Sequence, residues 1–191
     1  MPIQRFSHVA YRCVDARKTV DFYTQLLGLE YAFGVAENYV PSTGRFDPHI
    51  HVFLRVSPGS YLAFFELSEA AEMGFDPNTP DWVQHIALQV PSVEEVRRFK
   101  ETLEGAGIAV IGVTDHGIFK SIYFRDPSGH RVEITCESLS EEMSEQLRSR
   151  SQALLEEWSR TRRAPDIGIH RSGELGIPDC TRQTSNQGSR A

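Results

Sequence analysis

Two histidines and two glutamates occupy matching places in the 191-residue sequence, and side chains of these types can bind a metal ion. His8 and His85 each lie in a short apolar segment, whereas Glu66 and Glu133 each lie in a later one. One histidine alone is weak evidence for a metal site, because most histidines have other roles. Two imidazoles and one carboxylate on a face favour non-haem Fe(II), which activates oxygen, whereas four protein ligands suit a Lewis-acid metal.

The segments around these residues repeat one plan, in which a strand and a helix are followed by three more strands. Asp15 and Ser92 are expected to cap the two helices, which should end at Gly28 and near Gly105. The later strands are expected at 29–35, 49–56, 60–67, 108–114, 118–125 and 130–136. If a pseudo-two-fold axis relates the repeats, the four candidate ligands can converge on one point. We therefore expect an α+β fold, with two βαβββ modules forming a curved mixed-sheet cup and helices outside.

Composition divides the chain further. We expect the first module at 1–67, a polar connector rich in Pro and Gly at 68–82, and the second module at 83–136. Residues 137–163 carry an apolar stripe with acidic residues early and basic residues late, which predicts a C-terminal helix. Residues 164–191 contain many structure-breaking residues and little periodicity, which predicts a flexible, disordered tail.

Turn residues predict which side chains become neighbours. In the segment Asp126–Gly129, the Asp, Pro and Gly residues stand where a three-residue hairpin loop needs them. Counting back along both strands pairs Tyr123 with Glu133, so their side chains should share a face. The same counting around the earlier Pro-Gly turn pairs His51 with Glu66, which makes His51 a candidate partner of a metal-bound group.

The paired modules and their histidines and glutamates, over about residues 3–136, resemble the vicinal oxygen chelate superfamily. That superfamily includes glyoxalases, extradiol dioxygenases and fosfomycin- or bleomycin-resistance proteins. Residues 114–133 resemble the signature of type I extradiol ring-cleavage dioxygenases, which runs from a histidine through an apolar–Tyr pair to an acidic-Pro-x-Gly turn and the ligand glutamate. This resemblance implies that Tyr123 hydrogen-bonds a substrate oxygen and that His116 lies near the catechol.

The same resemblance implies an Fe(II) ion held by His8, His85 and Glu133. His51, with His49 as a weaker alternative, is the nearest match to the acid–base histidine of two-domain relatives. The implied activity is extradiol cleavage of a catechol-type aromatic substrate by O2. The two modules could build the site within one chain or across a dimer, and we expect a homodimer or a higher homo-oligomer.

Two other functions stay open at this point. A glyoxalase I-like lyase or isomerase would use Zn, Ni or Mn, with Glu66 as a fourth ligand. A third possibility is a resistance-type protein that binds an aromatic or antibiotic ligand without turnover. The aromatic residues that could line its cavity are Phe53, Tyr61, Phe64, Phe65, Phe119, Tyr123 and Phe124.

Composition and charge restrict the partners and the compartment. The 26 acidic and 20 basic side chains give a net charge of −6, which argues against binding nucleic acid. No stretch approaches the roughly 20 apolar residues of a membrane span, and the N-terminus has no signal-peptide run. The three cysteines show no Cys-x-x-Cys spacing. We therefore expect a cytoplasmic protein that acts on a small molecule.

Overall fold

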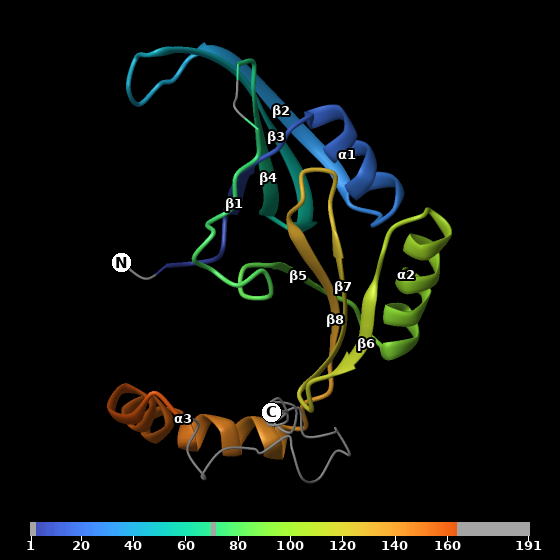
Figure 1. Ribbon diagram of the computed structural model, residues 1–191, viewed down its shortest axis with the longest axis vertical. Coiled ribbons are helices and arrows are strands. Elements are labelled where there is room, and N and C mark those ends of the chain that lie inside the picture. The colour runs from blue at the N-terminus through green and yellow to red at the C-terminus, as the bar shows by residue number, and fades with distance from the viewer. Residues whose placement is uncertain (1–2, 70–71, 164–191) are drawn as a thin grey trace, which may run out of the picture. The chain divides into compact units, whose positions relative to one another are not determined.

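The computed structural model describes residues 3–69 and 72–163, in which two four-stranded mixed sheets and three helices are formed (Figure 1). In each sheet the first strand is parallel to the last strand of its module, and the strand orders are β1-β4-β3-β2 and β5-β8-β7-β6. The α+β class and the two βαβββ modules are therefore confirmed. The elements are β1 (His8–Arg12), α1 (Ala16–Gln25), β2 (Glu30–Tyr39), β3 (Phe46–Ser57), β4 (Ser60–Leu67), β5 (Ile86–Gln89), α2 (Val93–Gly105), β6 (Ile111–Asp115), β7 (Phe119–Arg125), β8 (Arg131–Glu137) and α3 (Glu141–Thr161).

The chain forms two compact units, and each is described by itself. The first unit comprises both modules except the β6–β7 turn, and the second comprises, among the described residues, 115–120 and 137–163, which include α3. None of the helices in the described ranges is long and apolar enough to cross a membrane. The predicted tail at 164–191 lies outside the described residues.

The helices begin where their capping residues predict. Asp15 Oδ1 accepts a hydrogen bond from the backbone of Lys18 at 2.9 Å, and Ser92 Oγ accepts one from the backbone of Glu95 at 3.3 Å. Gly28 adopts a φ of +71°, which glycine tolerates without strain and which ends the first helix. The predicted helix starts are thereby confirmed.

The β2–β3 hairpin is longer than predicted. Residues 36–48 were expected to form a loop, but β2 continues to Tyr39 and β3 begins at Phe46. The pairing slips between Glu37 and Tyr39, opposite the segment of β3 that contains Pro48. Because proline has no N–H to give to a ladder, an irregular pair at this place lets the strands continue past it.

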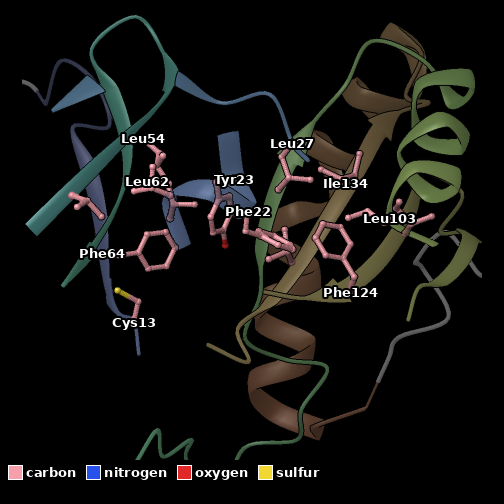
Figure 2. Packing of buried hydrophobic residues seen from close by; sticks show 14 of the residues in the cluster. Cys13, Phe22, Tyr23, Leu27, Leu54, Leu62, Phe64, Leu103, Phe124 and Ile134 are labelled. Atoms are coloured by element: carbon pink, nitrogen blue, oxygen red, sulfur yellow. The ribbon is translucent and has the colours of Figure 1, made fainter. Parts of the chain in front are cut away.

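The buried residues of both modules form a single apolar cluster (Figure 2). Leu62 and Phe64 alternate along β4 on the face that packs against α1, and Tyr23 of α1 is fully buried. The rings of Phe22 and Phe124 lie 6.2 Å apart between their centres, which joins the first module to β7 of the second. Burial of these side chains gives the first unit one shared core.

The β7–β8 turn is attached to the first module by polar contacts as well. Tyr23 donates a hydrogen bond to Oδ2 of Asp126 at 3.1 Å, and the backbone N–H of Val14 donates to Oγ of Ser128 at 3.1 Å. The Nε2 atom of His130 lies 2.8 Å from the backbone oxygen of Arg12. The turn that shapes the second sheet therefore also fixes how β7 and β8 join the first module.

Candidate metal centre

The second module brings His85 and Glu133 into direct contact. In the parallel β5–β8 pair, Ala87 lies opposite Glu133, so the side chains of His85 and Glu133 share a face of the sheet. The Nε2 atom of His85 lies 3.1 Å from Oε2 of Glu133. The Nδ1 atom of the same ring lies 3.0 Å from the backbone oxygen of Val83, a contact that orients Nε2 toward the carboxylate. An imidazole nitrogen and a carboxylate oxygen are thus presented together, as two ligands of a divalent metal would be.

Tyr123 lies beside this pair, as the turn predicts. Its hydroxyl donates a hydrogen bond to Oε1 of Glu133 at 3.2 Å. The backbone N–H of Asp126 donates to the carbonyl of His130 at 3.0 Å, and this pair closes the three-residue loop that the turn residues predict. The pKa of Tyr123 is raised above its ordinary value, mainly because the hydroxyl is partly buried and also because the negative charge of Glu133 lies beside it. The phenol therefore keeps its proton near neutral pH and can donate it in a hydrogen bond.

The first module places His8 and His51 near each other. The ring centres of His8 and His51 are 6.0 Å apart, and His8 also contacts Phe53 at 5.6 Å between ring centres. His51 stacks on Phe65 with a centre distance of 3.6 Å, and its Nε2 atom is buried without a hydrogen-bond partner among the described residues. Burial, then the charges of His8 and His49, lower the pKa of His51 to about 4. His51 is therefore uncharged at neutral pH.

His49 is engaged elsewhere. Its Nδ1 atom lies 2.7 Å from the backbone oxygen of Asp47, and its Nε2 atom lies 3.8 Å from Oε2 of Glu37. With both ring nitrogens beside other groups, His49 is a weaker candidate than His51 for proton transfer.

Glu66 differs from Glu133 in both face and contacts. The predicted pairing of His51 with Glu66 is wrong, because the β3–β4 register slips between Arg55 and Ser57 and sets His51 opposite Phe65. Glu66 lies on the same face of β4 as the buried side chains of Leu62 and Phe64, which is the face that packs against α1. Its Oε2 atom accepts a hydrogen bond from the backbone N–H of Ala16, the first residue of α1, at 2.6 Å.

The strand registers also identify the true counterpart of Glu133. In the first module the residue two after His8 lies opposite Ala63, and in the second the residue two after His85 lies opposite Glu133. The expected equivalence of Glu66 with Glu133 is therefore wrong, and Ala63 occupies the equivalent place. The first module presents one histidine at this position of its sheet and no acidic partner across from it.

The expected convergence of four ligands is not found within one chain. Among residues 3–69 and 72–163, no three His, Cys, Asp or Glu side chains gather as a metal-binding group. His8 belongs to the first sheet, whereas Glu133 belongs to the second and His85 directly precedes β5 of that second sheet. The structure brings together His85, Glu133 and Tyr123 on one side, and His8 with His51 on the other.

His116 lies in the second compact unit, in the turn between β6 and β7. Its backbone N–H donates to the carbonyl of Phe119 at 2.7 Å, and its neighbours Asp115 and Lys120 form an ion pair. The role of His116 beside a substrate stays a prediction.

A cavity of about 670 Å³ opens beside His85, and the sequence did not predict its walls. Part of its lining comes from the connector, which was interpreted only as a link between the modules. Phe75 of the connector lies edge-on to His130, with 5.7 Å between ring centres. The aromatic residues within the otherwise polar connector are the sequence feature that could have predicted that the connector lines a cavity. The charged and titratable side chains in its walls include His85, Arg131, Asp76 and Asp81.

Comparison with known families agrees with this architecture. The family model of the Glyoxalase/Bleomycin resistance protein/Dioxygenase superfamily matches residues 5–134. The chain belongs to this superfamily. Members of the superfamily share paired modules but differ in chemistry, so membership alone does not fix the reaction.

Two curated relatives illustrate this range. MhqA of Bacillus subtilis (strain 168), named as a ring-cleaving dioxygenase, is 27% identical over 141 residues, or 72% of this chain and 42% of that protein. A 2-epi-5-epi-valiolone epimerase of an Actinomyces species is 26% identical over 141 residues, or 66% of this chain and 76% of that protein. The chain thus spans less than half the length of MhqA.

Solved structures share the fold. Glyoxalase I of Leishmania major superposes with a TM-score of 0.54 at 18% identity, covering 82% of this chain and 99% of that one. A glyoxalase/bleomycin resistance/dioxygenase domain from Frankia sp. EAN1pec gives a TM-score of 0.56 at 19% identity, covering 71% and 99%.

Proposed function

We propose that this superfamily member is an extradiol ring-cleaving dioxygenase that uses Fe(II) and O2 on a catechol-type aromatic substrate. The observation that carries the proposal is Ala63 at the place equivalent to Glu133. It leaves a candidate ligand set of His8, His85 and Glu133. Two histidines and one carboxylate leave open positions on a metal and are the set that non-haem Fe(II) oxygenases use. The similarity to MhqA supports the same reaction class.

In this proposal the chain's own residues bind and orient the substrate. A bound Fe(II) ion would bring the aromatic diol and O2 together and carry charge between them. In the structure the single hydroxyl proton of Tyr123 is donated to Glu133 at 3.2 Å; once Glu133 binds a metal, the hydroxyl would turn to donate this proton in a hydrogen bond to a substrate oxygen. His51 lies next to His8 and is the candidate that accepts a phenolic proton. Its lowered pKa, about 4, makes it a weak base, so a bound metal would have to make the diol more acidic for this transfer.

In this proposal the third metal ligand, His8, comes from a second copy of the chain. Within one chain His8 does not gather with His85 and Glu133 among the described residues. Large apolar side chains of β2 and β3 are exposed, which is costly for a surface that meets only water. They include Phe33, Val35, Tyr39 and Phe46, which are 44% to 63% exposed. A symmetric dimer would cover such residues and create two equivalent sites.

A metal-dependent isomerase or epimerase is the second candidate. The observation that favours it is coverage, because the match to the Actinomyces epimerase spans 76% of that protein. Such an enzyme would bind Zn, Ni or Mn and would need a base for proton transfer rather than O2.

Metal analysis followed by turnover distinguishes these candidates. The protein is purified without oxygen, its metal content is measured, and substituted catechols are screened for the yellow ring-fission product. We expect Fe(II) to be bound, phenanthroline to abolish cleavage, and Fe(II) with ascorbate to restore it. Ring cleavage that survives chelation contradicts the proposal. Bound Ni or Zn without oxygen uptake favours the isomerase, and ligand binding without turnover favours a resistance-type binding protein.

A further inference from the structure

Arg131 is a half-buried cation next to the candidate metal ligands. It is the first residue of β8 and precedes Glu133 by two positions, so both side chains lie on one face of the strand. Its guanidinium carbon lies 4.3 Å from the centre of the Tyr123 ring. The ring face attracts the cation and restricts where the guanidinium can lie.

One hydrogen-bond donor of Arg131 is not used by the described residues. Its Nε atom is buried and has no hydrogen-bond partner among them. Other arginines differ, since Arg125 pairs with Asp81 at 3.2 Å and Arg55 pairs with Glu30 at 2.9 Å. A buried donor without an acceptor costs free energy, and because Arg131 lines the cavity, a guanidinium that turns toward a ligand there can offset that cost.

The cavity next to Arg131 offers few free negative groups to compete. Asp81 is held by Arg125, and Asp76 accepts hydrogen bonds from the side chain of Thr79 and the backbone of Asn78. Glu133 is the acidic residue closest to Arg131 along β8. If a divalent metal ion binds Glu133 and neutralises its carboxylate, the net charge around Arg131 becomes more positive.

We propose that Arg131 binds an anionic substituent of the substrate, so that the substrate class is an aromatic diol that carries a carboxylate. This inference rests on the proposed function, since it takes Glu133 and His85 as metal ligands. A guanidinium presents donors in a planar fork that matches the two oxygens of a carboxylate. The diol then faces the metal while the carboxylate faces Arg131 in the same cavity, and Arg131 selects the substrate.

The test compares two ligands that differ by one negative charge, 3,4-dihydroxyphenylacetate and its methyl ester. Dissociation constants are measured by calorimetry in the absence of O2, with Fe(II)-loaded and metal-free protein. The variants are Arg131→Gln and Arg131→Lys, and the control is Arg97→Gln, which removes an equal charge from the exposed surface of α2.

The wild type and Arg97→Gln should bind the free acid about tenfold or more tightly than the ester, as expected of a charge-assisted pair. Arg131→Gln should lose that preference while its affinity for the ester stays the same, and Arg131→Lys should keep part of it. No preference in the wild type, or an unchanged preference in Arg131→Gln, overturns the inference. Failure of the proposed function is seen separately, as absent Fe(II) binding or absent cleavage of the ester.

Discussion

Replacing Glu66 with Gln tests whether this residue supports a helix or binds the metal. Its Oε2 atom accepts a hydrogen bond from Ala16 at the start of α1, at 2.6 Å. Gln keeps a side-chain oxygen at this place but loses the negative charge, which is worth about 0.3–1 kcal/mol at a helix N-terminus. Glu66→Ala also loses the hydrogen bond, and bonds to charged groups contribute about 1.5–3 kcal/mol. We expect the free energy of unfolding to fall by these amounts.

The assay combines urea unfolding, followed by tryptophan fluorescence, with metal quantitation on the folded protein. Glu66→Gln should retain the wild-type metal content, because Ala63 rather than Glu66 lies at the place equivalent to Glu133. Glu133→Gln is the matched variant and should weaken metal binding more than about tenfold, because loss of a group that only orients a ligand already costs about that much. If folded Glu66→Gln loses metal as Glu133→Gln does, the reasoning from strand register is refuted.

Three further predictions concern buried or reactive groups. Tyr23→Phe removes the donor to buried Asp126 and should lower the free energy of unfolding by about 1–3 kcal/mol in urea titrations; a loss under about 0.5 kcal/mol would contradict this. Burial raises the pKa of Asp126, so the folded state favours its protonated form. The free energy of unfolding of the wild type, measured in urea titrations, should therefore rise relative to that of Asp126→Asn as pH falls from neutral toward 4. Burial raises the pKa of Cys13 to about 11, so peptide mapping after iodoacetamide treatment at pH 8 should find Cys13 unmodified in folded protein and modified in urea; rapid native labelling would disagree.

The module plan could be predicted from sequence because its signals are local. Asp15 and Ser92 cap helices through bonds to residues three positions later, so spacing along the chain is sufficient evidence. The Tyr123–Glu133 contact also follows from one short turn, whose residues fix the register of the two strands.

The errors arose from an irregular strand pairing and from contacts between residues that are distant in the sequence. The bulge near Arg55 shifts the β3–β4 register by one residue, and a shift of one residue moves a side chain to the other face. Glu66 was misassigned because its spacing from His8 resembled that of Glu133 from His85, whereas its role depends on the approach of α1. The part of the connector that lines the cavity likewise becomes visible only when the β7–β8 turn lies beside it.

The most direct test of the account is the metal content of mixed variants. His8→Ala and His85→Ala are each purified, mixed in equal amounts under conditions that exchange subunits, and loaded with Fe(II). If His8 of one copy completes the His85–Glu133 pair of the other, each variant alone binds no tight Fe(II), and the mixture regains about a quarter of the wild-type sites. A mixture that forms mixed dimers yet stays without tightly bound Fe(II), or a single variant that keeps its metal, would contradict a site shared between two copies.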